Sequence, residues 1–142
     1  MRNFFLLALL LCGLAFVALP AAQAQITRDI EANIPFSFFV QETKLPAGKY
    51  TIKVVHDTDQ GIMEIESADD KVSLMFEVLD SQAESAPNSS VVIFKRYGKN
   101  EYLSKIYNGG NKYGSRLPMT HSELNLKKSG ITAAEHPDAA SK

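Results

Sequence analysis

Leu45-Pro46-Ala47-Gly48-Lys49-Tyr50-Thr51-Ile52-Lys53-Val54 is the stretch that decides the fold. Pro46 presets the backbone for the second position of a type I turn, and Gly48 suits its fourth position. After the turn, apolar and polar residues alternate from Tyr50 to Val54. Such alternation is typical of a β-strand that has one face in the core and the other in solvent. The stretch therefore predicts a turn followed by a half-buried strand.

The same alternation recurs along the chain and sets the fold class. Six strands are predicted, over residues 30–40, 49–56, 62–67, 72–79, 90–97 and 101–107. Pro35 interrupts the first of them, which indicates an edge strand or a strand bent at a bulge. The polar interval 80–90 and the glycine-rich interval 108–115 are predicted loops. Short strands joined by turns predict an all-β domain, a single antiparallel β-sandwich or small β-barrel of about six to eight strands.

A change of pattern near residue 120 predicts a short C-terminal helix. Thr120 followed by Glu123 forms a capping-box signature, and Met119 and Leu124 are spaced as a hydrophobic staple. Lysines near residue 128 and Gly130 suit the end of such a helix. The alternative is a last strand, because the apolar residues of 119–128 also alternate with polar ones. Residues 129–142 carry few large apolar groups and are predicted to be a disordered tail.

The first residues predict export. A short basic start precedes an apolar run from Phe4 to Leu19, and Ala22-Gln23-Ala24 supplies the small residues of a cleavage site. The run is shorter than the roughly 18 residues that a membrane-spanning helix needs. We therefore expect residues 1–24 to be a signal peptide, 25–128 a β-domain and 129–142 the tail. The predicted location is the periplasm or the extracellular space, without stable membrane insertion after cleavage.

Composition excludes several classes of function. The one cysteine, Cys12, lies in the predicted signal peptide, so the mature chain would have no disulfide and no thiolate nucleophile or ligand. Removal of Arg2 with the leader leaves 14 basic and 16 acidic residues, a net charge of −2. Nothing in this balance forms the basic field that nucleic acid requires. We expect no nucleic-acid partner.

Residues with catalytic or metal-binding chemistry do not form a recognisable motif. His56 stands beside Asp57 and Asp59, but further metal ligands are not visible, and a calcium loop starting here would have Ala68 at its twelfth position. His136 lies in the predicted tail. No serine stands in a Gly-x-Ser-x-Gly elbow, and no Lys-Ser/Thr follows the glycines of 108–115. The sequence therefore predicts no catalytic, metal or cofactor-binding residue.

The best candidate for a binding surface combines tyrosines and cations on two neighbouring strands and the next loop. If the hairpin turns at residues 98–100, several of these side chains become cross-strand neighbours. Tyrosines beside cations suit a glycan, an acidic polymer or a protein partner, whereas ordinary cross-strand packing is the alternative explanation. The residues are Arg96, Tyr97, Tyr102, Lys105, Tyr107 and Tyr113, with Lys95 beside them.

Four segments resemble a family of small exported proteins of soil bacteria that have no assigned function. They are Ile34-Pro35-Phe36-Ser37-Phe38, Leu45 to Tyr50, Phe94-Lys95-Arg96-Tyr97-Gly98 and Tyr102 to Tyr107. The similarity covers most of the mature chain in the same order. It implies export and the fold, and it carries over no active-site residue. The segment from Leu45 to Tyr50 also resembles the strand entry of transthyretin-like and carboxypeptidase-regulatory β-sandwiches.

These observations predict a non-catalytic β-domain with a binding or structural role at the cell envelope. Its partner would be an extracytoplasmic ligand or an envelope protein. The first alternative is a small β-barrel that carries an apolar ligand, in which Phe36, Phe38, Phe76 and Phe94 would line a cavity. A second alternative, a hydrolase, would need a buried carboxylate or histidine cluster.

Overall fold

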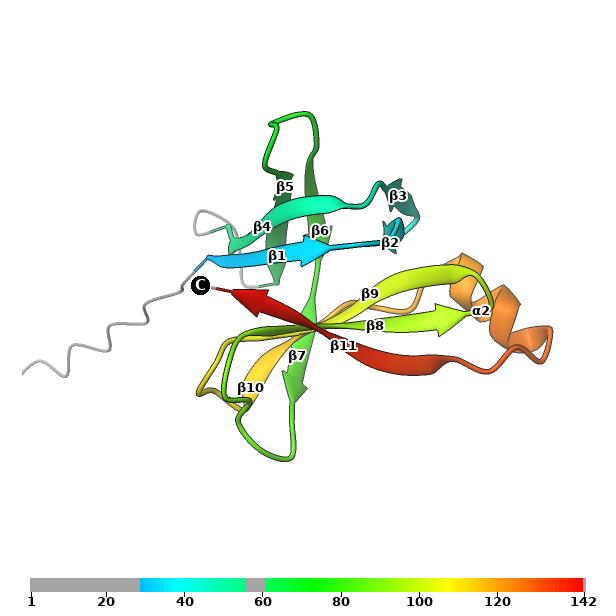
Figure 1. Ribbon diagram of the computed structural model, residues 1–142. Helices are drawn as coiled ribbons and strands as arrows, with labels where there is room; N and C mark the ends of the chain where they lie inside the picture. Colours follow the sequence, from blue (N-terminus) through cyan, green and yellow to red (C-terminus); the bar gives the residue numbers. More distant parts are fainter. Residues whose placement is uncertain (1–28, 56–60, 142) are drawn as a thin grey trace, which may run out of the picture.

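The computed structural model describes residues 29–55 and 61–141, which form two β-sheets and one helix (Figure 1). The first sheet contains β1 (Ile30–Ile34), β4 (Gly48–Val54), β5 (Ile62–Ser67) and β6 (Ser73–Glu77). The second contains β2 (Phe38–Val40), β3 (Thr43–Leu45), β7 (Leu79–Gln82), β8 (Val91–Tyr97), β9 (Asn100–Tyr107) and β10 (Tyr113–Arg116). A further strand, β11 (Ala134–Ser141), pairs with β8 and β1, and the helix is α2 (His121–Lys128).

The strands run in the order β3-β2-β9-β8-β11-β1-β4-β5-β6. All of these pairs are antiparallel except the short contact between β2 and β9. β7 follows β6 after the single residue Val78 and pairs with β10, which in turn pairs with β9. The two sheets therefore form a sandwich-like domain with one side bridged by β7 and β10. This confirms the predicted all-β class, although the 11 described strands exceed the predicted six to eight.

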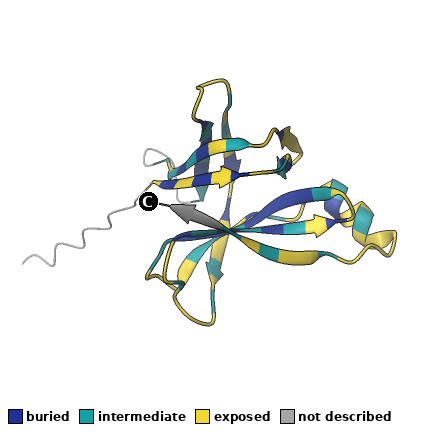
Figure 2. Ribbon diagram, in the orientation of Figure 1, coloured by how far each residue is buried: buried dark blue, intermediate teal, exposed yellow. Residues whose placement is uncertain are grey.

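Alternation places the core where the sequence predicts it. In β1 and β4 buried side chains alternate with exposed or half-buried ones (Figure 2). The buried ones include Ile34, Tyr50 and Ile52, whereas Val54, in phase with them, is 36% exposed at the end of β4. Ring side chains from both sheets meet between them: Phe38 packs edge-on against Tyr50 and against Phe94, with centroid distances of 5.3 and 5.5 Å. Burial of these side chains supplies most of the folding free energy, because the effect scales with the apolar area removed from water.

Pro35 divides the first predicted strand into two. β1 ends at Ile34, and the chain then crosses to the other sheet, where it forms β2. β1 itself lies between β11 and β4, so the prediction of an edge strand is wrong. Because proline cannot donate to a ladder, it suits the crossover between sheets better than the interior of either.

Two short strands form where loops were predicted. Apart from Leu79 and Arg116, β7 and β10 lie in the predicted loops 80–90 and 108–115, and they pair with each other over four residues. Neither strand has the apolar alternation that would have predicted it. Each has little contact with the core and is held mainly by its backbone. Gly114 permits the pairing of β10 with β9, since a Cβ there would collide with the carbonyl of Ile106 and the ring of Tyr107.

The predicted helix is confirmed, and its ends are formed by the residues that predicted it. Thr120 Oγ1 accepts from the Glu123 N–H, and the Glu123 carboxylate accepts from the Thr120 N–H, both at 3.0 Å. At the other end Gly130 adopts φ +82°, and the amides of Gly130 and Ile131 donate to carbonyls of the last turn. This is the Schellman arrangement, which favours glycine at the left-handed position.

The predicted disordered tail over 129–142 is wrong for the described residues 134–141. They form β11, which pairs with β8 over six residues and joins β8 to β1. The sequence of this strand lacks apolar alternation and contains Pro137, so its order comes from the backbone groups of its two neighbours.

Candidate functional site

The tyrosines and cations predicted as a binding surface do not lie on one exposed face. Tyr97, Tyr102 and Tyr107 are buried, whereas Tyr113 is 59% exposed on β10. β9 is covered on both sides, so the alternate residues that the sequence would place in solvent are covered as well, whereas β8 keeps a half-exposed face. The predicted set therefore separates into three groups with different neighbours.

The first group is an aromatic cluster beside α2. Tyr102 stacks on Phe39 with a centroid distance of 4.8 Å, and Tyr97 meets Tyr102 edge-on at 5.8 Å. Burial, followed by the negative charge of Glu123, raises the pKa of both tyrosines. Both hydroxyls therefore stay protonated at neutral pH, and the cluster is part of the packing between helix and sheet. Tyr107 lies apart from it, where its hydroxyl shares a 2.7 Å hydrogen bond with Ser81.

The second group consists of lysines paired with β11. Lys105 lies 3.0 Å from the carboxylate of Glu135, and Lys95 lies 4.0 Å from it. Glu135 is on the strand that the sequence assigned to a tail, so this pairing could not be predicted. Both ion pairs are partly exposed, and exposed pairs contribute little to stability.

The third group is a charged cluster on the other face of the same strands. The carboxylate of Glu101, which is 8% exposed, accepts from Nε of Arg96 and lies 2.8 Å from Nε2 of His136. Phe94 stacks on the His136 ring at 6.0 Å, and Phe36 meets it edge-on at 5.7 Å. His136 is therefore held in place, contrary to the prediction that it lies in a tail. No hydroxyl of the described residues forms a hydrogen bond with it, and the cluster joins β9, β8 and β11.

A hollow between α2 and the second sheet, here called the helix groove, combines exposed apolar side chains with lysines. Its volume is about 380 Å³. Met119 and Ile131 are large apolar side chains that remain 39% and 38% exposed beside it. Two lysines but no carboxylate are among its lining residues. Lys95 is paired with Glu135 outside the lining, whereas Lys127 forms no salt bridge with any residue of 29–55 or 61–141. The groove is lined by Lys95, Tyr97, Met119, Lys127, Gly130, Ile131, Thr132 and Ala133.

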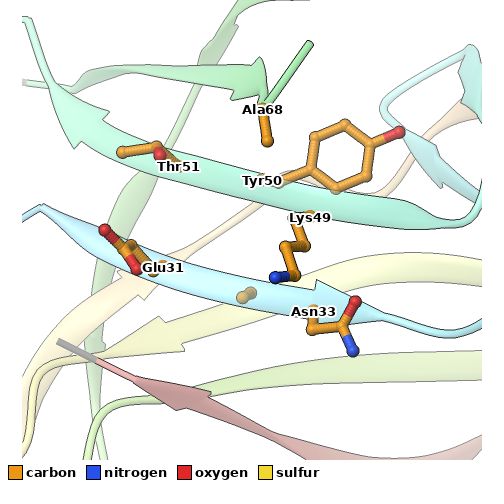
Figure 3. A pocket seen from close by; sticks show the side chains of 7 residues that line it. Glu31, Asn33, Lys49, Tyr50, Thr51 and Ala68 are labelled. Carbon is orange, nitrogen blue, oxygen red and sulfur yellow. The ribbon is translucent and has the colours of Figure 1, made fainter.

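Two further hollows flank the turn that decides the fold. One, of about 240 Å³, lies over β1 and β4, where Lys49 extends between Glu31 and Asn33 (Figure 3). The other, of about 500 Å³, lies between residues 46–50 and 67–72. Its wall is fixed by the Tyr50 hydroxyl, which donates to the carbonyl of Pro46 at 2.6 Å. Acidic and basic side chains are mixed along both hollows, so neither selects for one sign of charge.

Asp69, at the edge of the larger hollow, has a perturbed pKa. The hydroxyl of Ser67 donates to its carboxylate at 2.7 Å, and Lys71 lies 3.0 Å away. The Ser67 hydrogen bond, followed by that of Lys71, lowers the pKa of Asp69 from 3.8 to about 2. The ionised form is therefore the one that the folded turn favours.

We expect this turn to make stability depend on pH in acid. Because the pKa of Asp69 is lower in the folded state, its contribution is complete above about pH 4 and is lost as the pH falls towards 2. Urea-unfolding midpoints measured over this range should fall less steeply in Asp69→Asn than in the wild type. The matched control is Asp70→Asn, since no hydrogen bond from a described residue reaches the Asp70 carboxylate. Equal slopes for the wild type and Asp69→Asn would contradict the assignment.

Other predicted chemistry lies elsewhere or outside the described residues. His56, Asp57 and Asp59 fall in the range 56–60, which the structure does not describe. Within the described ranges, no three His, Cys, Asp or Glu side chains are grouped so as to hold a metal ion. Nor does this part of the chain contain a helix with the length and hydropathy needed to cross a membrane.

The helix groove was missed by the sequence analysis, although part of its signal was present. The capping box and Gly130 predict where α2 begins and ends, and Met119 and Lys127 follow from those limits. What the sequence does not predict is that α2 lies over Tyr97, because that contact joins segments distant in the chain. Comparison of the chain with protein-family models, with curated proteins and with solved structures finds no match.

Proposed function

We propose that the mature chain is an exported, non-catalytic binding domain of the cell envelope, and that the helix groove is its binding site. The ligand would carry an anionic group next to an apolar one. The observation that carries this proposal is the composition of the groove, in which exposed Met119 and Ile131 stand beside Lys127 without a lining carboxylate. Export is supported by the leader-like residues 1–24.

Apolar side chains left in contact with water are stabilised when a ligand covers them. A lysine at the rim of such a groove attracts an anion, and its charge is screened less beside a low-dielectric wall than in open solvent. The groove is also built on a fixed element, since α2 is capped at both ends and Ser122 donates to Glu42 near β3. A site on a rigid element loses little conformational entropy on binding.

Carriage of an apolar ligand inside the sandwich is less well supported. Phe94 contacts both Phe36 and Phe38, with centroid distances of 5.1 and 5.5 Å. Phe76 is 2% exposed within the same core. Rings at these distances fill the space between the sheets.

A hydrolase is also less well supported than a binding domain. Glu101 and His136 are a buried carboxylate and a histidine in contact, which is one requirement of such an enzyme. The Glu101 carboxylate, however, is already engaged by Arg96 and His136. A general acid or base needs a free position towards its substrate, and this pair is occupied in joining strands.

The Lys127→Glu variant should bind an apolar anion more weakly than the wild type. We expect octanoate, used as the probe, to bind about 30-fold more weakly, because an attraction of about 1 kcal/mol is lost and a repulsion of similar size is added. Amide chemical shifts of Tyr97 and Ile131 in a titration of residues 25–142 would give the dissociation constants.

The matched control is Lys128→Glu, which makes the same charge change one residue outside the groove lining. It should change octanoate affinity less than twofold, and octanol should bind more weakly than octanoate to the wild type. Equal losses in the two variants would show that only net charge matters and would reject the groove as the site.

A further inference from the structure

β11 is an unusual strand for its position in the sheet. It lies between β8 and β1, inside the strand order. Its sequence, Ala-Glu-His-Pro-Asp-Ala-Ala-Ser, has no large aliphatic or aromatic hydrocarbon side chain. Its neighbours, by contrast, contribute some of the most deeply buried residues of the core, such as Val92 and Ile30. An interior strand normally adds apolar side chains to both of its neighbours, and β11 does not.

What holds β11 is therefore its backbone and the contacts of two polar side chains. It pairs with β8 from Ala134 to Ala139, and with β1 only at Ala140 and Ser141. Among side chains, Glu135 reaches Lys105 from an exposed position, and His136 reaches Glu101 and packs on the rings of Phe94 and Phe36. None of the residues 134–138 belongs to the hydrophobic core.

One inward-facing position of β11 is unfavourable. Asp138 lies opposite Val92, as His136 lies opposite Phe94, so both point to the side of the sheet that faces the core. Oδ2 of Asp138 is buried and has no hydrogen-bond partner among the described residues. A buried acceptor without a partner is destabilising. An apolar side chain at this position would remove that cost and pack on Val92.

From these observations we infer that the place of β11 between β8 and β1 is a strand-addition site. The ligand is an extended segment of a partner protein that carries a large apolar side chain at the position of Asp138 and a ring that donates to Glu101 at the position of His136. It displaces β11, repeats its backbone hydrogen bonds and adds the side-chain packing that β11 lacks. This inference does not depend on the helix groove as a ligand site.

The chemistry of the site between β8 and β1 favours a segment of a different protein over β11 of a second copy of this chain. β11 of a second copy would bury the same Asp138, so exchanging one β11 for another would not improve the packing on Val92. The connection to β11 can open without disturbing α2, because the hydrogen bonds that end the helix stop at the Ile131 amide, and Thr132 and Ala133 follow outside any helix or strand. α2 itself is fixed by its capping box.

A reversible lock on β11 tests the inference. The double variant Ile93→Cys/Pro137→Cys places two thiols on cross-strand neighbours, on the face away from the core. Neighbours of this kind lie about 4.5–5.5 Å apart, within the span of a disulfide. The only native cysteine, Cys12, lies in the predicted leader, so residues 25–142 contain no competing thiol. Oxidation then holds β11 in its slot, and reduction releases it.

The probe is a fluorescein-labelled peptide of residues 134–141 with one change, Asp138→Val. After incubation to equilibrium, fluorescence anisotropy should show at least tenfold tighter binding to the reduced than to the oxidised protein. The same peptide with Asp138 retained is the control and should bind at least fivefold more weakly. Binding that is equal in the two redox states would place the peptide elsewhere and overturn the inference, as would an absence of binding to the reduced protein.

Two further measurements use the mature chain without the cysteine substitutions, so they test the displacement of β11 even if the cysteine variant fails to fold. Amide hydrogen exchange in residues 134–138 should be at least tenfold faster than in β9, because β11 opens locally. Exchange at the same rate as β9 would contradict displacement. In size-exclusion chromatography with light scattering the chain should be monomeric. A dimer held by exchange of β11 would identify a second copy as the occupant and would reject the foreign segment.

Discussion

The Phe94→Ala variant is expected to lose about 3–5 kcal/mol of folding free energy. Phe94 is fully buried on β8 and contacts three other rings, those of Phe36, Phe38 and His136. Truncation removes the ring and leaves a cavity bounded by both sheets, which close packing prevents from collapsing completely. Urea unfolding of residues 25–142 followed by circular dichroism would measure the loss.

Phe39→Ala is the matched control for Phe94→Ala. Phe39 is also a phenylalanine of the second sheet, but it is half-buried and stacks on Tyr102 outside the core. We expect its loss of stability to be about 1–2 kcal/mol. Equal losses for the two variants, or a loss below about 1 kcal/mol for Phe94→Ala, would contradict a filled core between the sheets.

The second large effect is expected for Glu101→Ala, at about 2 kcal/mol of folding free energy. Its buried carboxylate accepts hydrogen bonds from Arg96 and His136, so removal leaves both groups without their partner. The exposed side of Arg96 can be hydrated, which keeps the cost below that of a fully buried pair. Urea unfolding again gives the value.

A double-mutant cycle separates the contact with His136 from the rest of the effect. Combining Glu101→Ala with His136→Ala should give a coupling of about 1 kcal/mol, since the two side chains are in direct contact. Strict additivity would show that the histidine and the carboxylate do not stabilise each other. Glu135→Ala is a useful comparison, because its ion pairs are exposed and its effect should stay below about 1 kcal/mol.

Features that depend on local sequence were predicted well. The strand from Gly48 to Val54 and the helix from His121 to Lys128 both follow from residues inside or next to them. Alternation is a property of a single strand, and a capping box spans four residues. Such signals are visible without knowledge of the rest of the fold.

Features that depend on distant neighbours were not predicted. β11 contains Pro137 and small or polar residues, so nothing in its own sequence indicates a strand, and only the free backbone groups of β8 and β1 make it one. The burial of Tyr97 and Tyr102 has the same origin. Alternation shows that a strand has two faces, but it does not show that both are covered. For this reason the predicted surface of tyrosines separated into packing residues, and the helix groove remained undetected.

The edge strands of the two sheets also affect how readily the protein associates with itself. Among the described residues, the strands with an unpaired side include β3, β6 and β7, which are three to five residues long. Each carries or adjoins a charged residue, such as Lys44, Glu77 or Asp80. Short, charged edge strands are poor templates for the repeated edge-to-edge pairing of chains that leads to fibrils. We therefore expect the mature protein to resist aggregation at high concentration, and any incoming chain to gain a long ladder only by entering the interior of the sheet.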